Sequence, residues 1–291
     1  MTKRGSTFAI LITVLLAGGL AAACSPVRML NALTPASEYL LTADVAYGPD
    51  PRQRLDLYTP RSAAPINGFP VVVFLYGGAW NRGDRADFQF VGEALASRGI
   101  LAVLADYRLY PQVRYPDFLH DSARALAWAQ REAARLGGNP GRLFVMGHSA
   151  GAYNAAMLAL DQSWLKAQGS SPSVLAGWIG LAGPYDFLPM TNADAQPVFF
   201  HPDYPKDSQP IAFAGRTSPR SFLGAAFTDT LVNPERNTRQ LADKLAAAGV
   251  PVTLRFYDKV DHVTLIGAFA RPLRWMAPVL DDVAAFVKGA P

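Results

Sequence analysis

The stretch Leu143–Leu160, LFVMGHSAGAYNAAMLAL, constrains the fold more than any other part of the sequence. An apolar run with strand character ends at Met146, and an alanine-rich segment with helical character begins at Ala150. The intervening Gly147–Gly151 fits Gly-x-Ser-x-Gly, which predicts a sharp strand-to-helix turn where crowded backbone leaves no room for side chains. Such a turn exposes the hydroxyl of Ser149 above the sheet, in front of the positive helix N-terminus. We therefore interpret Ser149 as a nucleophile.

The rest of the chain alternates between short apolar runs and amphipathic stretches. Strands are predicted over residues 54–58, 71–75, 100–105, 143–146, 175–182, 221–226 and 252–257, and helices over 121–136, 234–248 and 279–287, with Asp121 as the N-cap of the first helix. Continuous apolar runs suit strands that are buried on both faces of a parallel sheet. This alternation predicts an α/β fold, with a mostly parallel central sheet and helices on both faces. Residues 191–219 are expected to form an irregular excursion over one end of the sheet.

The first 24 residues differ in kind from the remainder. Lys3 and Arg4 precede the uncharged stretch Phe8–Leu20, and Ala21–Ala23 then lead into Cys24, the single cysteine. This order of basic, apolar and small residues is typical of an export signal, and the apolar stretch is short for a transmembrane helix. A cysteine directly after small residues resembles the lipobox of bacterial lipoproteins, although the first of these alanines stands where that motif prefers leucine.

Three segments are therefore expected along the chain: a signal peptide of the lipoprotein type over residues 1–23, a tether over 24–39 and a folded domain over 40–291. An acyl group on Cys24 would hold the domain at a bacterial membrane, in the cell envelope and facing the periplasm. Ordinary signal-peptidase cleavage or an uncleaved anchor, with Cys24 incidental, is the open alternative.

Composition narrows the classes of function. Half of the 291 residues are hydrophobic, enough for one large domain with a sizeable core. The net charge is +4, but the basic residues are scattered singly, which argues against nucleic-acid binding. The four histidines and the single cysteine form no cluster with metal-ligand spacing, so neither a metal nor another cofactor is expected.

A serine nucleophile needs a base that is itself held by an acid. In folds with this turn the acid and then the histidine follow the serine along the chain. His120 precedes Ser149, and His148 lies inside the turn, where we expect it to pack, so His201 and His262 remain. His262 is favoured because it follows the last predicted strand, at the carboxyl end of the sheet, whereas His201 lies in the irregular excursion.

The acid is expected in the loop after the strand that precedes the last helix–strand unit. Asp229 lies in that loop, which would place its carboxylate beside His262. Asp186 paired with His201 is the rival, because this combination also obeys the chain order. Two further aspartates near the favoured histidine have plainer interpretations, in solvation of the loop and capping of a turn: Asp258 and Asp261.

These motifs resemble α/β-hydrolases of the carboxylesterase kind, near the BD-FAE-like and prenylcysteine-methylesterase-like groups. The resemblance covers about residues 44 to 288 and is carried by Tyr76-Gly-Gly-Ala-Trp80, Asp106-Tyr-Arg-Leu109, Gly147-His-Ser-Ala-Gly151, Asp229 and His262. Two departures stand out, since Tyr76 replaces the usual histidine and the Asp229 loop reads Gly-Ala-Ala-Phe-Thr-Asp rather than His-Gly-x-x-Asp. The family pattern implies that Tyr76 acts through packing.

The resemblance also gives a meaning to the glycine pair that follows residues 71–75. By itself such a pair is either a plain turn or a place where backbone must approach something closely. In the family it belongs to an oxyanion loop, which implies backbone N–H donors at Gly78 and Ala79, joined by Ala150 after the nucleophile.

The function implied is that of a serine hydrolase that cleaves small-molecule carboxylic esters through an acyl-enzyme. Ser149 would attack, His262 would transfer the proton and Asp229 would orient the histidine. An apolar substrate pocket could be lined by aromatic side chains: Trp80, Tyr185, Phe199 and Phe200. Two alternatives stay open, namely amide-bond hydrolysis on the same scaffold, by a formamidase or peptidase, and a catalytically silent binding protein of the cell envelope.

Overall fold

The computed structural model describes residues 26–289, so the predicted export signal and Cys24 lie outside the described residues. The strands are β1 (Tyr39–Ala46), β2 (Arg54–Pro60), β3 (Phe69–Leu75), β4 (Leu101–Ala105), β5 (Gly138–His148), β6 (Leu175–Leu181), β7 (Ser221–Ala226) and β8 (Val252–Tyr257). The α-helices are α2 (Pro26–Ala32), α3 (Gln89–Ser97), α4 (Asp117–Glu132), α5 (Ala150–Leu160), α6 (Gln162–Lys166), α7 (Gln240–Ala247), α8 (His262–Gly267) and α9 (Val279–Lys288). Shorter helical turns are η1 (Arg85–Phe88), η2 (Pro172–Val174), η3 (Gln196–Phe199), η4 (Pro210–Phe213), η5 (Glu235–Arg239) and η6 (Arg271–Leu273).

All of these strands join one sheet in the order β1-β2-β4-β3-β5-β6-β7-β8. The pairs β1–β2 and β2–β4 are antiparallel, and every other neighbouring pair is parallel. The central strands β3 and β4 are buried along their whole length, as their continuous apolar sequences predict. The mostly parallel sheet confirms the predicted α/β class.

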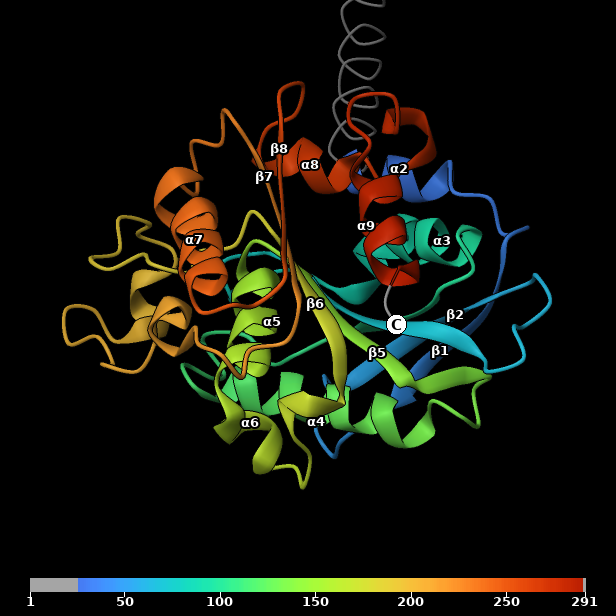
Figure 1. Cartoon of the computed structure of the whole chain (residues 1–291), viewed down its shortest axis with the longest axis horizontal. Coiled ribbons are helices and arrows are strands. Elements are labelled where there is room, and N and C mark those ends of the chain that lie inside the picture. Colours follow the sequence, from blue (N-terminus) through green and yellow to red (C-terminus); the bar gives the residue numbers. More distant parts are fainter. Residues whose placement is uncertain (1–25, 290–291) are drawn as a thin grey trace, which may run out of the picture.

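Helices cover both faces of this sheet (Figure 1). On one face α3 contacts α9, and Arg98, the C-cap of α3, binds Asp281 of α9 at 2.7 Å. On the other face α4 packs against α5, and α6 contacts both. The parallel strands all point their carboxyl ends to one edge of the sheet, so the loops that follow β3, β5, β7 and β8 meet there.

The helix expected over residues 121–136 begins one turn earlier, at Asp117. Asp121 is therefore not the N-cap, and this prediction was wrong. Its buried carboxylate accepts hydrogen bonds from Arg108 Nε at 2.8 Å and from Gln53 Nε2 at 2.7 Å. Long-range ionic partners account for this aspartate, and local sequence could not indicate them.

The segment expected to be a tether, residues 24–39, is structured over much of its described length. Residues 26–32 form α2, whose Leu30 packs against the core, and the side chain of Asn31 donates to the carbonyl of Ala86 at 2.7 Å. Tyr39 is already part of β1. Within residues 26–289, none of the helices combines the length and the hydrophobicity that a membrane span needs.

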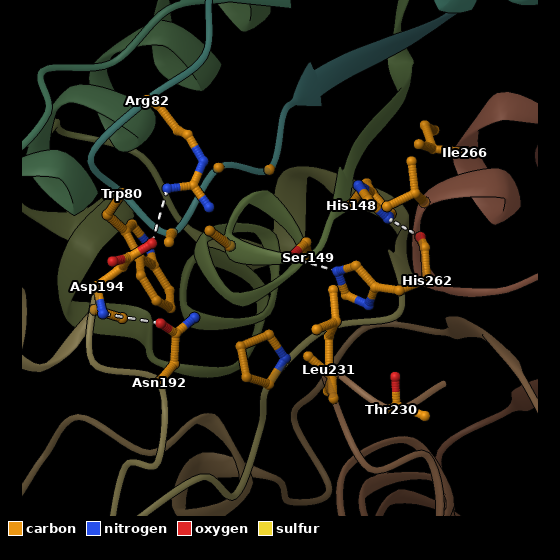
Figure 2. A pocket seen from close by; sticks show the side chains of 18 of the residues that line it. Trp80, Arg82, His148, Ser149, Asn192, Asp194, Thr230, Leu231, His262 and Ile266 are labelled. Atoms are coloured by element: carbon orange, nitrogen blue, oxygen red, sulfur yellow. Dashed lines mark hydrogen bonds and ion pairs between the residues drawn. The ribbon is translucent and has the colours of Figure 1, made fainter. Parts of the chain in front are cut away.

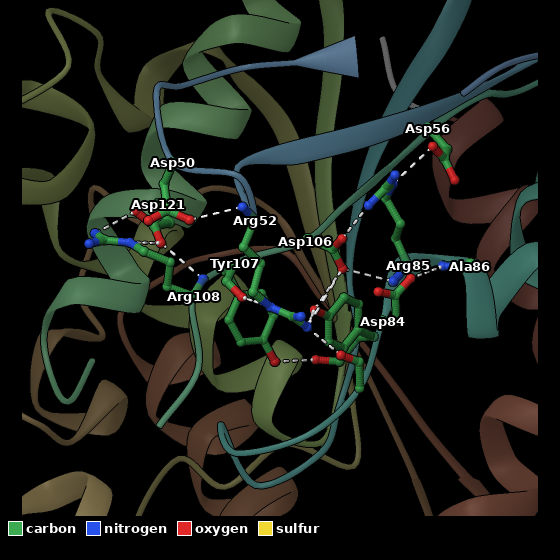
Figure 3. Close-up of polar contacts among 12 residues, drawn as sticks. Asp50, Arg52, Asp56, Asp84, Arg85, Ala86, Asp106, Tyr107, Arg108 and Asp121 are labelled. Atoms are coloured by element: carbon green, nitrogen blue, oxygen red, sulfur yellow. Dashed lines mark hydrogen bonds and ion pairs between the residues drawn. The ribbon is translucent and has the colours of Figure 1, made fainter. Parts of the chain in front are cut away.

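A buried cluster of charged and hydroxyl groups lies beside the loop that leaves β3 (Figure 3). Asp106, which follows β4 and is 2% exposed, accepts hydrogen bonds from Tyr76 Oη at 2.8 Å, from the backbone N–H of Arg85 at 2.8 Å and from the Arg85 guanidinium. Burial raises the pKa of the Asp106 carboxyl, whereas these donors favour its ionised form. The charge on Asp106 therefore depends on its partners.

Arg52 completes this cluster and fixes both ends of the loop. Its guanidinium donates to Tyr76 Oη at 2.9 Å, to the carbonyl of Gly83 and, through Nε, to the carbonyl of Tyr107 at 2.9 Å. The Tyr76 ring stacks between Phe88 and Tyr107, with centroids at 5.6 and 4.9 Å. Tyr76 thus packs as the sequence predicts, and its hydroxyl also joins an arginine to a buried carboxylate.

We expect Tyr76→Phe to lower the free energy of unfolding by about 1–3 kcal/mol, because Asp106 loses a donor and Arg52 an acceptor inside the protein. The phenyl ring keeps the stacking, so the loss reports on the hydroxyl alone. Urea denaturation at pH 7 measures it, with Tyr204→Phe as the matched control. Within residues 26–289 the hydrogen-bond partner of the Tyr204 hydroxyl is the exposed His201, and removal of this hydroxyl should change stability by less than about 0.5 kcal/mol. Equal losses in the two variants would contradict the prediction.

Candidate active site

Ser149 occupies the turn between β5 and α5 in a strained backbone conformation, with φ of 54° and ψ of −123°. Its N–H donates to the carbonyl of Leu181 on the neighbouring strand β6, at 2.9 Å. The glycine two residues later is required by close approach, because a Cβ on Gly151 would lie 2.0 Å from the carbonyl oxygen of Leu75. The first turn of α5 therefore rests directly against the carboxyl end of β3. Non-glycine residues with positive φ cluster at functional sites, where surrounding structure holds the strain.

A continuous chain of hydrogen bonds joins Ser149 to two other predicted residues. His262 Nε2 lies 2.8 Å from Ser149 Oγ, and His262 Nδ1 lies 2.7 Å from Asp229 Oδ2. His262 is the first residue of α8, in the loop region after β8, and Asp229 follows β7. Both distances suit proton transfer from serine to a carboxylate-supported imidazole.

The Asp229 carboxylate is fixed by its own loop. Its side chain is completely buried, and Oδ1 accepts hydrogen bonds from the backbone N–H groups of Leu231 and Val232, both at 2.9 Å. The other oxygen is thereby directed at His262. A carboxylate oxygen in this position accepts from the imidazole and so holds His262 in the tautomer with hydrogen on Nδ1.

The structure does not bring the rival pair to the serine. Asp186 binds Arg236 at 3.1 Å, and the exposed His201 has its Nδ1 2.8 Å from the hydroxyl of Tyr204. Asp261 caps α8 by accepting from two backbone N–H groups, in agreement with the turn-capping interpretation of this residue. Among the described residues, none of these three lines the cavity that contains Ser149.

His148 makes a contact that the sequence did not predict. Its Nε2 lies 2.8 Å from the backbone carbonyl of His262, and the two imidazole rings are 5.0 Å apart (Figure 2). A carbonyl can only accept, so Nε2 of His148 carries the hydrogen and donates it. His148 thus binds the backbone of His262, in addition to the packing role that the sequence predicts for it.

The loop after β3 passes directly over the serine. A Cβ on Gly77 would lie 2.8 Å from Ser149 Cβ, so only glycine allows this approach. Ala79 and Trp80, two residues further on, both have positive φ, at 50° and 57°. The glycine pair is therefore more than a plain turn.

The three backbone groups predicted to form the oxyanion hole are Gly78, Ala79 and Ala150, and all of them line the cavity with Ser149. Within residues 26–289, their N–H groups have no hydrogen-bond acceptor in the protein. Backbone donors at the edge of a cavity are available to a ligand.

The cavity has a volume of about 770 Å³ and opens beside these groups (Figure 2). Much of its wall is apolar, from side chains that include Leu30, Phe88, Phe90, Phe187, Met190 and Ile266. Arg82 and Asp194 form an ion pair of 3.1 Å on the polar side, next to Asn192. The cavity therefore suits a substrate that is mainly apolar with a polar end.

Of the four aromatic residues predicted for the pocket, the structure places only Trp80 there. Trp80 lines the cavity, and its indole N–H donates to Asn154 Oδ1 at 3.0 Å. Tyr185 does not line it, so that prediction was wrong. The Tyr185 ring is fully buried against Trp178 and covers Gly180 of β6, where a Cβ would lie 2.1 Å from the tyrosine oxygen.

The other two aromatic candidates do not line the cavity either. Phe199 packs behind Trp80, with ring centroids 4.9 Å apart, and Phe200 is partly exposed beside Arg114.

In the part of the chain that the structure describes, no group of three or more histidine, cysteine, aspartate or glutamate side chains is arranged to hold a metal ion.

Solved structures of esterases share this fold. Among solved structures, a truncated carbohydrate esterase from gut microbiota superposes with a TM-score of 0.72 at 17% identity, over 88% of this chain and 98% of that one. An esterase from Pyrobaculum calidifontis gives a TM-score of 0.74 at 22% identity, over 90% and 89% of the two chains. These likenesses confirm the α/β-hydrolase fold.

Two curated relatives have a higher sequence identity to this chain than these structures have, but the chain covers a smaller share of their length. The chain is 29% identical over 265 residues to isoprenylcysteine alpha-carbonyl methylesterase ICME of Arabidopsis thaliana, covering 84% of this chain and 61% of the relative. It is 32% identical over 228 residues to esterase LipC of Mycobacterium tuberculosis, covering 72% of this chain and 56% of that protein. The chain thus spans less than two thirds of the length of these two relatives. The family described as BD-FAE matches residues 55–245, well over half of the sequence. The chain belongs to the BD-FAE family.

Proposed function

We propose that this protein is a serine esterase that cleaves carboxylic esters through an acyl-enzyme intermediate. The observation that carries the proposal is the hydrogen-bonded series Ser149–His262–Asp229, which opens onto a largely apolar cavity. Relatives that are named as esterases support ester substrates over amides.

The reaction follows from the positions of these groups. His262 Nε2 takes the proton of Ser149 Oγ as that oxygen attacks the ester carbonyl, and Asp229 stabilises the imidazolium that forms. The tetrahedral intermediate then releases its alcohol, which takes the proton from His262. Water, deprotonated by the same imidazole, attacks the acyl-enzyme and returns the acid product and the free serine.

Negative charge on the carbonyl oxygen would be stabilised by the free backbone N–H groups of Gly78, Ala79 and Ala150. Ala150 is the first residue of α5, so the helix dipole adds a positive potential at the same place. Donors of this kind stabilise the transition state more than the substrate, because the charge that they bind appears only during the reaction.

His148 is a positioning residue in this scheme. Its Nε2–H donates to the carbonyl of His262, and burial, followed by the nearby charge of His262, lowers its pKa to about 3, so that His148 is neutral at pH 7. Neutral His148 also adds no positive charge beside the base. The same burial makes the folded protein sensitive to acid, because an unfolded chain protonates this histidine near pH 6.5.

The first prediction concerns the triad. Ser149→Ala and His262→Ala should each lower kcat by about 10⁴-fold or more, and Asp229→Asn by a similar factor, because each removes the activation of the nucleophile. Asp186→Asn and His201→Ala are the matched controls and should retain nearly full activity. The assay uses p-nitrophenyl esters of rising acyl length beside a formanilide and a peptide anilide, with fluorophosphonate labelling. Labelling of Ser149→Ala at the wild-type level would refute the assignment, and preference for an anilide would refute an esterase.

A second prediction concerns the oxyanion loop. Replacement of Ala79 by lactic acid, which turns one amide into an ester and removes the N–H while keeping the side chain, should lower kcat by about 10²- to 10³-fold. KM should change less. Proline is unsuitable here, because its φ near −65° conflicts with the φ of 50° at Ala79. Ala79→Gly keeps the N–H and should stay active; wild-type turnover by the lactate variant would exclude Ala79 as a donor.

A third prediction concerns acid stability. The pKa of His148 is lower in the folded than in the unfolded state. Its contribution to the free energy of unfolding is therefore intact above about pH 6.5 and is lost as the pH falls from there toward 3. The loss from this one group approaches about 1.4 kcal/mol per pH unit. His148→Gln, whose amide can still donate to the His262 carbonyl, should have a flatter dependence of unfolding free energy on pH between 6.5 and 4. His201→Gln should retain the wild-type slope, and identical slopes in all three proteins would contradict the argument.

A further inference from the structure

The docked helix α2 sets how far the folded domain can lie from Cys24. Leu30 of α2 lines the cavity, and the Asn31 side chain binds the segment next to it, with its amide on the carbonyl of Ala86 and its oxygen 3.3 Å from the N–H of Phe90. Only Ser25 separates Cys24 from Pro26, where α2 begins. Two residues of extended chain reach at most about 7 Å. A group attached to Cys24 would therefore join the chain two residues ahead of α2 in the sequence.

Exposed apolar side chains gather on the segments around the mouth of the cavity. Half of the ten exposed large apolar residues of the described chain lie there, each between 56% and 75% exposed: Met29, Leu33, Leu231, Val263 and Trp275. We call these five residues the apolar rim. Leu231 and Val263 line the cavity themselves, and the others flank the lining residues Leu30 and Leu273. Figure 1 shows α2 and α8, which carry Met29 and Val263, at the same end of the molecule, and Leu33 follows the last residue of α2.

The chemistry of the rim fits a lipid surface. Clustered exposed apolar side chains around a cavity mark an interaction site, and tryptophan is enriched where lipid meets water. Charged groups remain beside the mouth, in the Arg82–Asp194 ion pair and in Asp261, the N-cap of α8. These charges would stay at the level of the headgroups, which limits the rim to shallow insertion.

We propose that the mouth of the cavity faces a lipid bilayer, with the apolar rim inserted at its surface, and that the substrates are esters carried in the bilayer. This inference rests on the proposed esterase function and on the predicted lipid on Cys24. With the anchor on one side of the mouth and the rim around it, a lipid-borne ester enters the apolar cavity without passing through water. Acyl chains then lie along the apolar wall, and the ester carbonyl lies at Ser149.

The test uses the full chain, expressed with its own export signal, extracted from membranes and reconstituted into phosphatidylcholine vesicles. Mass spectrometry of the intact protein should show a lipid on Cys24, and an unmodified cysteine would overturn the proposal. Two substrates are compared, p-nitrophenyl butyrate in solution and p-nitrophenyl palmitate within the vesicles. The triple variant Met29→Ser, Leu33→Ser, Trp275→Ser changes only rim residues outside the cavity. It should hydrolyse the soluble ester at the wild-type rate and the vesicle ester at least about tenfold more slowly.

The control triple variant is Leu40→Ser, Leu41→Ser, Ile66→Ser, which removes exposed apolar side chains from β1 and the β2–β3 loop, away from the cavity. It should match the wild type on both substrates. An equal loss in the two triple variants, or none in the rim variant, would overturn the membrane-facing mouth and leave the esterase proposal intact. A wild-type protein that hydrolyses neither substrate would instead overturn the proposed function.

A spectroscopic measurement keeps the inference testable if the rim variant does not fold. The fluorescence of Trp275, obtained as the difference between wild type and Trp275→Phe, should be quenched when the vesicles contain brominated phosphatidylcholine. Unquenched emission from Trp275 in vesicles would show that the rim stays in water and would overturn the proposal.

Discussion

The contact between the first turn of α5 and the carboxyl end of β3 is the constraint on which the site depends. It leaves no space for a side chain at Gly151, whose Cβ would lie 2.0 Å from the carbonyl oxygen of Leu75. Because β3 continues into the loop 76–83 and α5 starts one residue after Ser149, this contact places the serine beneath that loop. A side chain at Gly151 would separate β3 from α5, and thus the loop from the serine, without altering any residue that reacts.

Buried charge holds the same loop from its other side. Asp106 and Arg85 are oppositely charged groups in a poorly solvated region, where each is tolerated only while its partners remain in place. Arg52 extends the cluster to both ends of the loop, at Tyr76 and Gly83. These hydrogen bonds therefore fix the backbone conformation of the loop 76–83. The strained φ values within the loop are thus maintained by contacts that lie outside the cavity.

Regular elements, and the two residues that form a hydrogen-bonded series with Ser149, could be predicted from sequence because their signals are local or ordered along the chain. The observed bounds of β7 and β8 match the predicted ranges 221–226 and 252–257. Chain order together with position after a predicted strand selected His262 and Asp229, which the structure brings to the serine. The errors arose from tertiary contacts. Asp121 resembles an N-cap until its ionic partners are known, and Tyr185 resembles a pocket residue until its turn directs the ring into the core.

The position of α2 also decides how the protein can be handled. Any partner fused directly ahead of Pro26 is delivered to the entrance of the cavity, because Leu30 of the same helix forms part of its wall. At the other end of the chain, α9 finishes beside the start of β5, where Arg142 binds the carbonyls of Val287 and Lys288. Parallel strands begin at the edge opposite the site, so an affinity tag or a surface linker placed after α9 leaves the entrance clear.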